Sequence, residues 1–348
     1  MPRMVSFTSV RVAEVVDEES KPLAPDEVRI GTLYSGISAG TELTAYRGTN
    51  AYMNKKWDEK QRLFVDGSTS FEYPVNGWGY EEVGEVTEIG SEVSTVKVGD
   101  VVWGTWGHRT ETVQKEERAA KRILQAGTDA RVGIFSQIGA IALNVVLDGD
   151  IHVGETVVVF GLGVPGQLVA QLARLNGARV IGVDGVASRR ELALRLGADL
   201  VLDPADGPVA ERVRELTDGR GADVVLEVTG NYHALHEAIR TVAYNSRVCV
   251  AGFMQGEGIG LRLGDEFHHN RVQLVCAQIS GVNPSIDHRW NEYRLQRTFI
   301  DLAVAGKVNV TDLISHEMPL EEGGEAFAML DTATSDVLQV VLNAKAAD

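Results

Sequence analysis

The chain has 348 residues, of which 44% are hydrophobic, and its formal charge at pH 7 is −16. This length is sufficient for two domains with buried cores, and acidic charge spread along a chain disfavours nucleic acid and anionic membranes as partners. Apolar runs are too short to suggest a membrane span, and the N-terminus lacks the apolar core of a signal peptide. We therefore expect a cytoplasmic protein that acts on a small-molecule substrate.

The N-terminal part of the chain predicts β-structure. Runs rich in β-branched residues occur at 5–17 and 27–38, and residues 80–104 read as two strands around a turn with a third short strand at 107–114. Residues 48–79 are polar, contain several aromatic residues and show weak periodicity. A long irregular segment is often functional, so this one either lines or covers a substrate cleft or is a solvated surface loop.

A dinucleotide-binding pattern begins at Thr156. The apolar run 156–160 predicts a strand buried on both faces, and Gly161, Gly163 and Gly166 follow it in G-x-G-x-x-G spacing before a helical repeat. The first glycine permits a tight turn, the second lets the backbone approach a pyrophosphate, and the third lets helix and strand pack closely. The helix N-terminus would offer free N–H groups to the phosphates. The alternative is a glycine-rich turn without a ligand.

Asp184 ends the next predicted strand. A carboxylate at this place accepts hydrogen bonds from the adenosine ribose hydroxyls and would repel the extra phosphate of NADP. The sequence therefore favours NAD as the cofactor, although Arg189 and Arg190 lie close in sequence and weaken that preference.

Strands and helices alternate through the rest of this region. After a helix that starts near Val132, we expect strands at 156–161, 179–184, 200–203, 223–229, 247–252 and 273–279, with helices at 188–196, 208–217 and 232–243. This order predicts a doubly wound parallel sheet. Helices at 290–305 and 321–330 follow, and a last strand at 337–344 is expected to return to the N-terminal domain. Cys249 and Cys276 lie in apolar, strand-like runs and are expected to be buried core residues.

The order of a β-rich domain, a Rossmann domain and a C-terminal return resembles the medium-chain dehydrogenase/reductase family. The motifs that support the resemblance are GYEEVGEVTEIGSEVSTVKVGDVV, GETVVVFGLGVPGQ, DVVLEVTG and LISHEMPLEEGGEAFAMLD. The resemblance implies an α/β fold, with a GroES-like β-rich catalytic domain at 1–126 and 287–348 and a Rossmann domain at 127–286. It also implies hydride transfer between NAD(P) and an alcohol, aldehyde, ketone or activated double bond, and a homo-oligomer, either a dimer or a tetramer.

The chain departs from the zinc-dependent members at each ligand position. The cysteine place holds Ser38 or Ala39, the histidine of the GHE motif is replaced by Tyr80, and the third ligand region offers Ser136. Zinc sites need thiolate, imidazole or carboxylate ligands, and the four-cysteine structural lobe is missing. We therefore expect no metal.

One alternative remains for a metal, an oxygen and nitrogen site from Glu42, Glu81 and His108. Within the family, the segments SGISAGTE and NGWGYEEVGEV are most similar to a zinc-free group that includes bacteriochlorophyllide a dehydrogenase. That narrower similarity is local and does not transfer a substrate.

The resemblance also implies candidate catalytic residues. Tyr80 would face the cleft and donate to a carbonyl oxygen, or take the alcohol proton in reverse. His108 suits proton relay, Thr41 matches the family's hydroxyl relay position, and Glu42 and Glu81 would orient these groups or tune their charge. The alternatives are that Tyr80 fills the volume left by zinc, that His108 is an ordinary strand histidine and that Glu81 is structural.

Cofactor contacts are carried over by motif position. The loop at 162–164 should hold the pyrophosphate, residues after the fourth and fifth strands should border the adenosine and nicotinamide, and Gln278 should lie on the nicotinamide side. The candidate cofactor-binding residues are Gly161, Leu162, Gly163, Val164, Gly166, Asp184, Arg189, Thr229, Gly252, Phe253 and Gln278.

Together these features predict an NAD-dependent, zinc-independent oxidoreductase that interconverts a secondary alcohol and a ketone, with a sugar or cyclitol as the expected substrate. One alternative is an NAD(P)H-dependent quinone or enoyl reductase. The other is a non-catalytic NAD-binding protein.

Overall fold

The computed structural model describes residues 1–332 and 337–345. The chain divides into two compact units, the first formed by Met1–Gln137 and Ile314–Asp348 and the second by Ile138–Leu313. Both boundaries lie further along the chain than the expected 127 and 287, and helix α8 (Glu292–Val304) is part of the second unit. The reason is packing, because the ring of Phe299 in α8 lies 2.1 Å from the place that a Cβ on Gly139 would occupy.

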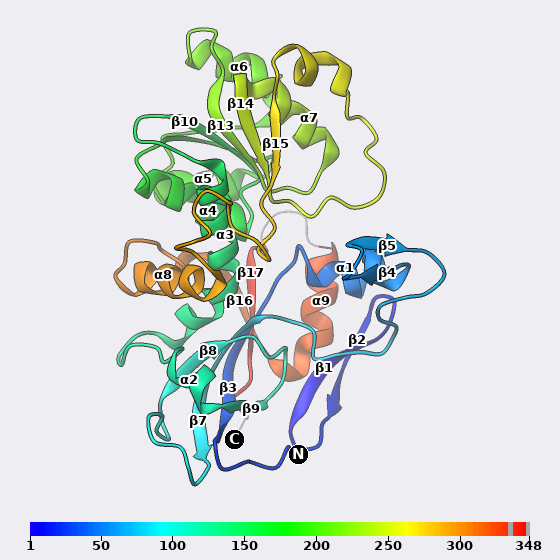
Figure 1. The fold of residues 1–348 in the computed structure, drawn as a ribbon, viewed down its shortest axis with the longest axis vertical. Coiled ribbons are helices and arrows are strands. Elements are labelled where there is room, and N and C mark those ends of the chain that lie inside the picture. Colours follow the sequence, from blue (N-terminus) through cyan, green and yellow to red (C-terminus); the bar gives the residue numbers. More distant parts are fainter. Residues whose placement is uncertain (333–336, 346–348) are drawn as a thin grey trace. The chain divides into compact units, whose positions relative to one another are not determined.

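The second unit contains the predicted doubly wound sheet (Figure 1). Its strands are all parallel and lie in the order β12-β11-β10-β13-β14-β15. The strands are β10 (Thr156–Phe160), β11 (Arg179–Val183), β12 (Leu200–Leu202), β13 (Ala222–Glu227), β14 (Val242–Val250) and β15 (Gln273–Cys276). The helices are α3 (Ser136–Gly149), which begins in the first unit, α4 (Val164–Leu175), α5 (Ala187–Arg195), α6 (Val209–Leu216), α7 (Tyr232–Thr241) and α8.

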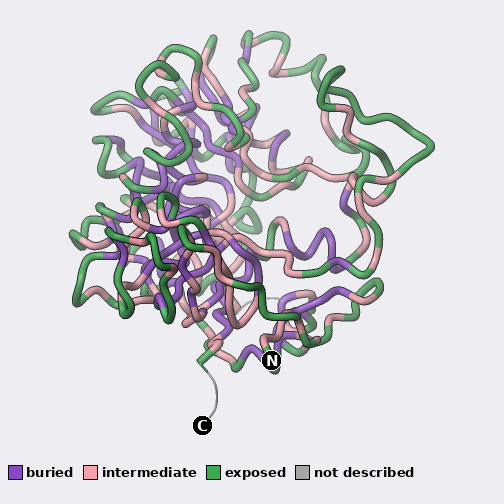
Figure 2. Tube along the Cα trace, turned by 60° about the horizontal axis from the view of Figure 1, so that its bottom comes forward, coloured by how far each residue is buried: buried purple, intermediate pink, exposed green. Residues whose placement is uncertain are grey.

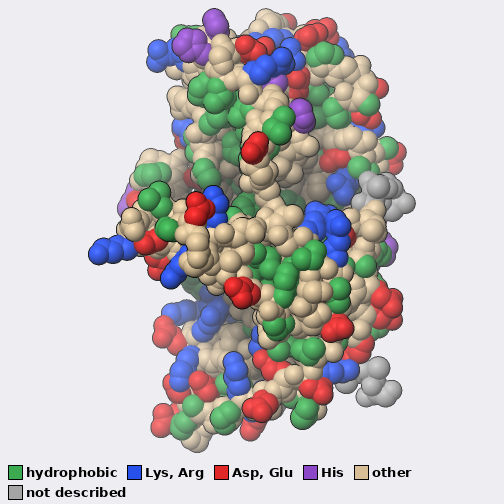
Figure 3. All heavy atoms as spheres, turned by 90° about the vertical axis from the view of Figure 1, so that its right-hand side faces the viewer, with side chains coloured by type: hydrophobic (Ala, Val, Ile, Leu, Met, Phe, Trp, Pro, Cys, Tyr) green, Lys and Arg blue, Asp and Glu red, His purple; other side chains and the backbone are tan. Residues whose placement is uncertain are grey.

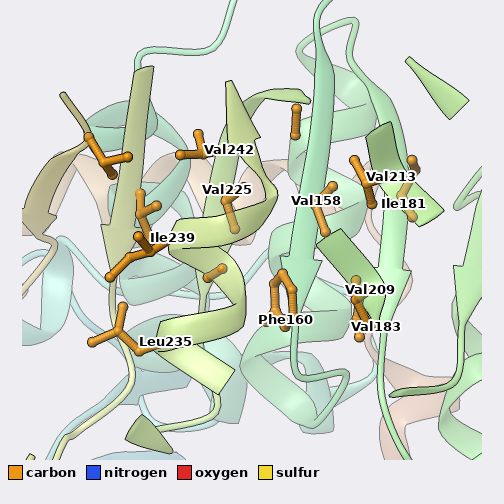
Figure 4. Close-up of a cluster of buried hydrophobic side chains, with 14 residues drawn as sticks. Val158, Phe160, Ile181, Val183, Val209, Val213, Val225, Leu235, Ile239 and Val242 are labelled. Carbon is orange, nitrogen blue, oxygen red and sulfur yellow. The ribbon is translucent and has the colours of Figure 1, made fainter. Parts of the chain in front are cut away.

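The core of this unit follows from the apolar runs that predicted the strands. Every residue of β10 is buried, as expected for a central strand covered on both faces. Figure 4 shows Val158 and Phe160 of β10 near Ile181 of β11, with Leu235 and Ile239 of α7 in the same cluster of buried side chains. The sheet is therefore stabilised by a core to which strands and helices far apart in the sequence contribute side chains.

Two expectations about apolar segments need correction. Cys249 is buried, but Cys276 is exposed, because β15 is the outermost strand of its sheet. The segment Ala130–Gly149 is long and apolar enough to cross a membrane by length and composition, contrary to the expectation that no run reaches that length. Since 78% of its apolar window is buried within the protein, the segment has the character of a core helix.

The first unit is built on sheets whose strand pairs are antiparallel except for the parallel pair β16–β17. The larger sheet has the order β16-β17-β3-β7-β8 with β9 paired to β3, and a smaller one has the order β2-β1-β6. The strands are β1 (Arg3–Ser9), β2 (Val12–Asp17), β3 (Glu27–Ile37), β4 (Lys56–Asp58), β5 (Leu63–Val65), β6 (Val75–Asn76), β7 (Glu81–Ile89), β8 (Val101–Gly104), β9 (Glu111–Lys115), β16 (Ile314–Pro319) and β17 (Gln339–Asn343). The helices are α1 (Glu42–Tyr46), α2 (Glu116–Ala120) and α9 (Gly323–Thr332). The predicted return of the chain is confirmed, because β17 pairs antiparallel with β3.

The segment 48–79 is more ordered than its sequence indicates. It contains the short hairpin β4–β5 and strand β6, and its aromatic residues pack against one another and against the core of the first unit. All three residues of β5 are exposed. Figure 2 shows the general pattern, in which buried residues follow the packed elements and exposed residues the connecting loops.

Charged side chains of both signs cover the surface. On the face drawn in Figure 3, Lys and Arg are interspersed with Asp and Glu. Many of these charges form exposed ion pairs, such as Arg212 with Glu215 and Lys121 with Glu117. Such pairs contribute little to stability individually.

Candidate cofactor and catalytic sites

The glycine-rich loop between β10 and α4 has the geometry that a pyrophosphate requires. Gly161 has a φ of +90°, which favours glycine, and a Cβ on Gly166 would lie 1.8 Å from the carbonyl oxygen of Gly161. No atom lies within 4 Å of the place of a Cβ on Gly163, so the main chain there is open to a ligand. Val164 then begins α4 with a free helix N-terminus. The loop therefore fits a phosphate-bearing cofactor.

The carboxylate of Asp184 fixes the neighbouring corner. Its Oδ2 accepts a hydrogen bond from the N–H of Leu162 at 2.7 Å, and its Oδ1 accepts one from the N–H of Val186 at 2.8 Å. The guanidinium of Arg189 lies 4.0 Å from Oδ2. Two carboxylate oxygens have about four lone-pair sites, so Asp184 retains acceptor capacity for ribose hydroxyls.

Gln167 also belongs to this corner, although sequence reasoning did not include it among the cofactor residues. Its side chain is fully buried, and its amide donates to the carbonyl oxygens of Leu162 at 3.1 Å and of Arg189 at 2.8 Å. It thereby ties the glycine-rich loop to the first turn of α5. The only signal in the sequence is a polar residue on the helix face that the periodicity assigns to the core.

A second corner lies where β13 and β14 end. Glu227 is fully buried at the end of β13, and its Oε1 accepts hydrogen bonds from the N–H of Thr229 at 2.7 Å and from the Thr229 hydroxyl. A Cβ on Gly252 would lie 2.2 Å from the nitrogen of Gly230, so the two loops touch through their main chains. Phe253 is 45% exposed beside them. The structure thus brings together Thr229, Gly252 and Phe253 and adds Glu227.

Gln278 lies one strand further along the sheet than the second corner. It follows β15, and its Oε1 accepts a hydrogen bond from the N–H of Ser280 at 2.7 Å. It lines a cavity of about 340 Å³ together with Asp148, Arg247 and Cys276. None of the other candidate cofactor residues lines this cavity.

In the first unit, the structure assembles a group of hydroxyls around Tyr80. The Tyr80 hydroxyl donates to Oγ1 of Thr41 at 3.2 Å and shares a short hydrogen bond with Oγ of Ser38. Thr41 precedes α1 as its N-cap residue. Burial, and next the charge of Glu81, raise the pKa of Tyr80 above its ordinary value. The phenol is therefore held in its protonated, hydrogen-bond-donating form.

A buried ion pair lies in the same unit. Nε2 of His108 is 2.6 Å from Oε2 of Glu42, and Nδ1 of His108 is 2.7 Å from Oγ of Ser35. Oε1 of Glu42 accepts a hydrogen bond from the N–H of Ser38 at 3.0 Å, which links the Glu42–His108 pair to the cluster of hydroxyls around Tyr80. Burial alone would lower the pKa of His108, but Glu42, by its charge and its hydrogen bond, and then Glu82, raise it. The geometry favours an imidazolium paired with a carboxylate.

The arrangement Ser35–His108–Glu42 has the connectivity of a nucleophilic triad, but it does not have the accessibility of one. Ser35, His108 and Glu42 have exposed fractions of 0%, and the Ser35 hydroxyl donates to Oε1 of Glu82 at 3.2 Å. Ser35 and Glu82 face each other in the β3–β7 register. Because both ring nitrogens of His108 have partners, this group positions its neighbours rather than reaching a substrate. Sequence reasoning missed Ser35 and Glu82.

Glu81 has a different environment from the other candidates. It is fully buried opposite Gly36 in the β3–β7 register. In the described part of the chain neither of its carboxylate oxygens has a partner with good hydrogen-bond geometry, although the side-chain amide of Gln339 lies close enough to oppose the rise of its pKa. Burial, followed by the charges of Glu42 and Glu82, raises the pKa of Glu81 well above 4.5, which favours its neutral form.

The residues present do not fit a catalytic zinc. Within residues 1–332 and 337–345, no group of three His, Cys, Asp or Glu side chains is arranged to hold a metal ion, so the alternative site of Glu42, Glu81 and His108 is not formed. Ser38 and Tyr80 do lie together, but they offer neutral hydroxyls, which are poor zinc ligands. Ser136 is fully buried.

Comparison with known proteins identifies the relatives of this chain. A family model described as zinc-binding dehydrogenase matches residues 163–292. D-guloside 3-dehydrogenase of Escherichia coli (strain K12) is 31% identical over 335 residues, which cover 94% of this chain and 95% of the relative. The similarity therefore extends well beyond the dinucleotide-binding region.

Solved structures share the fold at lower identity. A protein from Sinorhizobium meliloti 1021 described as a zinc-binding dehydrogenase and bound to NADP aligns with a TM-score of 0.77 at 22% identity, covering 99% of both chains. A short chain alcohol dehydrogenase of Escherichia coli CFT073 complexed with NADH aligns with a TM-score of 0.76 at 17% identity, covering 98% of this chain and 99% of the other. Neighbours with this fold thus carry either form of the nicotinamide cofactor.

Proposed function

Because the chain belongs to the zinc-binding dehydrogenase family, we propose that it is an NAD-dependent, zinc-independent oxidoreductase that interconverts a secondary alcohol and a ketone. The observation that carries the proposal is the cluster of hydroxyls formed by Ser38, Thr41 and Tyr80, which includes two of the positions where the family resemblance implies zinc ligands in zinc-dependent members. We propose in addition that the chain belongs with the zinc-free relatives of the bacteriochlorophyllide a dehydrogenase type, which the segments SGISAGTE and NGWGYEEVGEV favour.

Tyr80 supplies the chemistry that a Lewis acid would otherwise supply. Reduction of a ketone leaves negative charge on its oxygen, and a positioned hydrogen-bond donor stabilises that charge. The protonated Tyr80 phenol is such a donor, and it delivers its proton to the alkoxide as the alcohol forms. The Ser38 and Thr41 hydroxyls contact the phenol, and half-buried Thr41 can pass a proton to the phenolate while it takes one up from solvent. In the reverse direction the alcohol proton follows the same route outward.

The buried pair of Glu42 and His108 supports the cluster of hydroxyls without contacting the substrate. Glu42 accepts the main-chain N–H of Ser38 and thereby fixes the end of β3 relative to α1. Preorganised groups lower the barrier because they need no rearrangement during the reaction. Glu42 and His108 are thus positioning residues in this proposal.

The bound nicotinamide cofactor supplies or accepts the hydride. Asp184 at the end of β11 supports NAD over NADP, because its carboxylate would repel a 2′-phosphate. The counter-argument is the Arg189 guanidinium, 4.0 Å from that carboxylate. We propose NAD as the main cofactor.

The relative acting on a D-guloside supports a sugar, a glycoside or a cyclitol as the substrate. The polar and aromatic segment 48–79 offers stacking surfaces for such a molecule, and it includes half-buried Trp57 and Trp78. We also propose a cytoplasmic homo-oligomer. The exposed edge strand β15, with Leu274 at its surface, supports self-association.

The test is NADH formation at alkaline pH by chelator-treated protein with NAD and a panel of sugars, glycosides, cyclitols and simple secondary alcohols. Oxidation of a member of the panel that survives chelation supports the proposal, and the best substrate names the class. Activity that disappears on chelation and returns with zinc would contradict metal independence. Reduction of quinones or enones with NADPH in place of alcohol oxidation would replace it with the reductase alternative, and cofactor binding without any turnover would favour a non-catalytic role.

A further inference from the structure

Glu227 occupies a central place at the cofactor edge of the Rossmann sheet. It is the last residue of β13 and pairs with Phe160 of β10 on one side and with Val250 of β14 on the other. In open parallel sheets, ligands bind beyond the carboxyl ends of the strands. Glu227 is thus a buried acid directly behind the loops that are expected to border the cofactor.

Glu227 contacts both the loop that follows β13 and the loop that follows β14. Its side-chain Oε1 accepts hydrogen bonds from the N–H and the hydroxyl of Thr229. Its main-chain oxygen accepts the N–H groups of Ala251 at 2.9 Å and Gly252 at 3.0 Å. Its second carboxyl oxygen lies 2.7 Å from the place of a Cβ on Gly252. The carboxyl therefore fills the space between the turn after β13 and the turn after β14.

The second oxygen of this carboxyl takes part in none of these loop contacts as a hydrogen-bond acceptor. Oε2 of Glu227 is buried without a hydrogen-bond partner in the described part of the chain. Burial raises the pKa of Glu227, opposed by the hydrogen bonds of Thr229 and the N–H of Gly230, and no charged side chain of the described residues is among the causes. The raised pKa disfavours a buried negative charge behind the loops that are expected to border the cofactor.

We propose that Glu227 is a positioning residue for the nicotinamide cofactor, which holds the loops of Thr229 and Gly252 in the shape that the cofactor binds. It acts through these loops and touches no reacting atom. The proposal rests on the proposed function only in that a nicotinamide cofactor binds here. It does not depend on the alcohol substrate or on the absence of zinc.

The test measures binding of NADH, with NADPH in parallel, by fluorescence titration in the absence of any alcohol substrate. Three variants are compared with the unaltered protein: Glu227→Ala, Glu227→Gln and Asp223→Asn. Asp223 is the matched control, because it lies at the other end of β13, where it accepts the N–H of Thr156 at 2.8 Å and pairs with Arg220. Melting temperatures without cofactor report the structural cost of each change.

We expect Glu227→Ala to weaken NADH binding about tenfold, which corresponds to the loss of one or two buried hydrogen bonds. Glu227→Gln retains an acceptor for Thr229 and should bind NADH nearly as well as the unaltered protein near neutral pH. Asp223→Asn should lower the melting temperature without changing the dissociation constant of NADH. This pattern separates loop positioning from general stability.

A pH series gives a readout that a purely structural role would not move, and it remains available if Glu227→Ala does not fold. Because burial raises the pKa of Glu227, binding of NADH to the unaltered protein should weaken with rising pH as Glu227 loses its proton, whereas Glu227→Gln should show a flatter profile. Unchanged NADH binding by Glu227→Ala, equal loss of binding in Asp223→Asn, or identical pH profiles for Glu227→Gln and the unaltered protein would each overturn the proposal. Failure of the alcohol panel would leave these binding comparisons intact.

Discussion

The cofactor edge of the second unit and the cluster of hydroxyls around Tyr80 in the first unit are built in different ways. Around Gly161 and Gly163 the binding surface is main chain, and side chains such as Asp184 and Gln167 only fix its shape. Around Tyr80 the functional atoms are side-chain hydroxyls, carboxylates and an imidazole, and most of them are buried. A main-chain site needs glycines at set spacing, whereas a side-chain site needs partners from several elements.

This difference suggests how each site tolerates change. Main-chain N–H groups at a helix N-terminus survive most substitutions nearby, provided that the glycines remain. The buried charges of Glu42 and His108 are interdependent, because removal of one partner leaves the other without compensation. We therefore expect the sharpest losses of activity in the first unit and graded losses of cofactor affinity in the second.

The largest effect is expected from Tyr80→Phe, which tests the side-chain site directly. The substitution keeps the ring but removes the hydroxyl that contacts Ser38 and Thr41. Loss of a positioned proton donor should lower kcat about a hundredfold or more, while the dissociation constant of NADH stays unchanged. Steady-state kinetics together with NADH titration would check both parts.

Ser38→Ala is the matched control for Tyr80→Phe, since it removes one partner of the phenol and leaves the phenol in place. A smaller loss of kcat is expected for it. Normal turnover in Tyr80→Phe would mean that the tyrosine only fills volume. The hydroxyl of Tyr80 would then have no catalytic role in the first unit.

The extent to which the sequence predicts each site follows from the same contrast. The glycine-rich loop and Asp184 lie within one strand–helix–strand segment, so local spacing sufficed to predict their arrangement. The hydrogen bond between Ser35 and His108 joins residues 73 positions apart. Only the register of β3 and β7 brings Glu82 to Ser35, and no local pattern in the sequence encodes that register.

Other differences have equally specific causes. The return of the last strand to the first unit was predictable, because a completed parallel sheet leaves no place for another strand, but its pairing with β3 was not predicted. The second domain boundary was not, because the packing of Phe299 against Gly139 that places α8 in the second unit leaves no trace in helical periodicity. Cys276 shows the same limit, since an apolar run does not reveal whether its strand is central or at an edge.

A smaller effect is expected at Asp184, where the main-chain site depends on one side chain. Asp184→Ala removes the acceptor for the N–H groups of Leu162 and Val186 as well as the charge, so NADH binding should weaken about tenfold. Discrimination against NADPH should relax at the same time. Parallel titrations with NADH and NADPH would measure both changes.

Asp184→Asn separates charge from loop support, because the amide oxygen still accepts one N–H while the negative charge is gone. If charge sets the preference for NAD, the Asn variant should gain NADPH affinity as the Ala variant does. If it keeps the original preference, the repulsion argument fails, and Asp184 acts mainly by holding the loop.

The smallest effect is expected at Asp148, which extends the comparison to a buried charge in the second unit. Its carboxylate accepts from the amide of Asn144 at 3.1 Å and is only 5% exposed. Burial raises the pKa of Asp148 to about 6, partly opposed by the N–H of Asn283 and by Arg247. Because this pKa is raised on folding, the stabilising contribution of the proton is complete at low pH and is lost as the pH rises through about 6.

Asp148→Asn should therefore melt a few degrees above the unaltered protein at pH 7 to 8, with the difference shrinking toward pH 4, since the amide never becomes charged. Asp150→Asn is the control, because Asp150 is exposed and lies 3.8 Å from Arg247, and it should leave the melting temperature unchanged. A difference that is constant across the pH range would show that Asp148 is not titrating. Ionisation of Asp148 would then make no contribution to stability, and the contrast with the buried pair of Glu42 and His108 in the first unit would be larger.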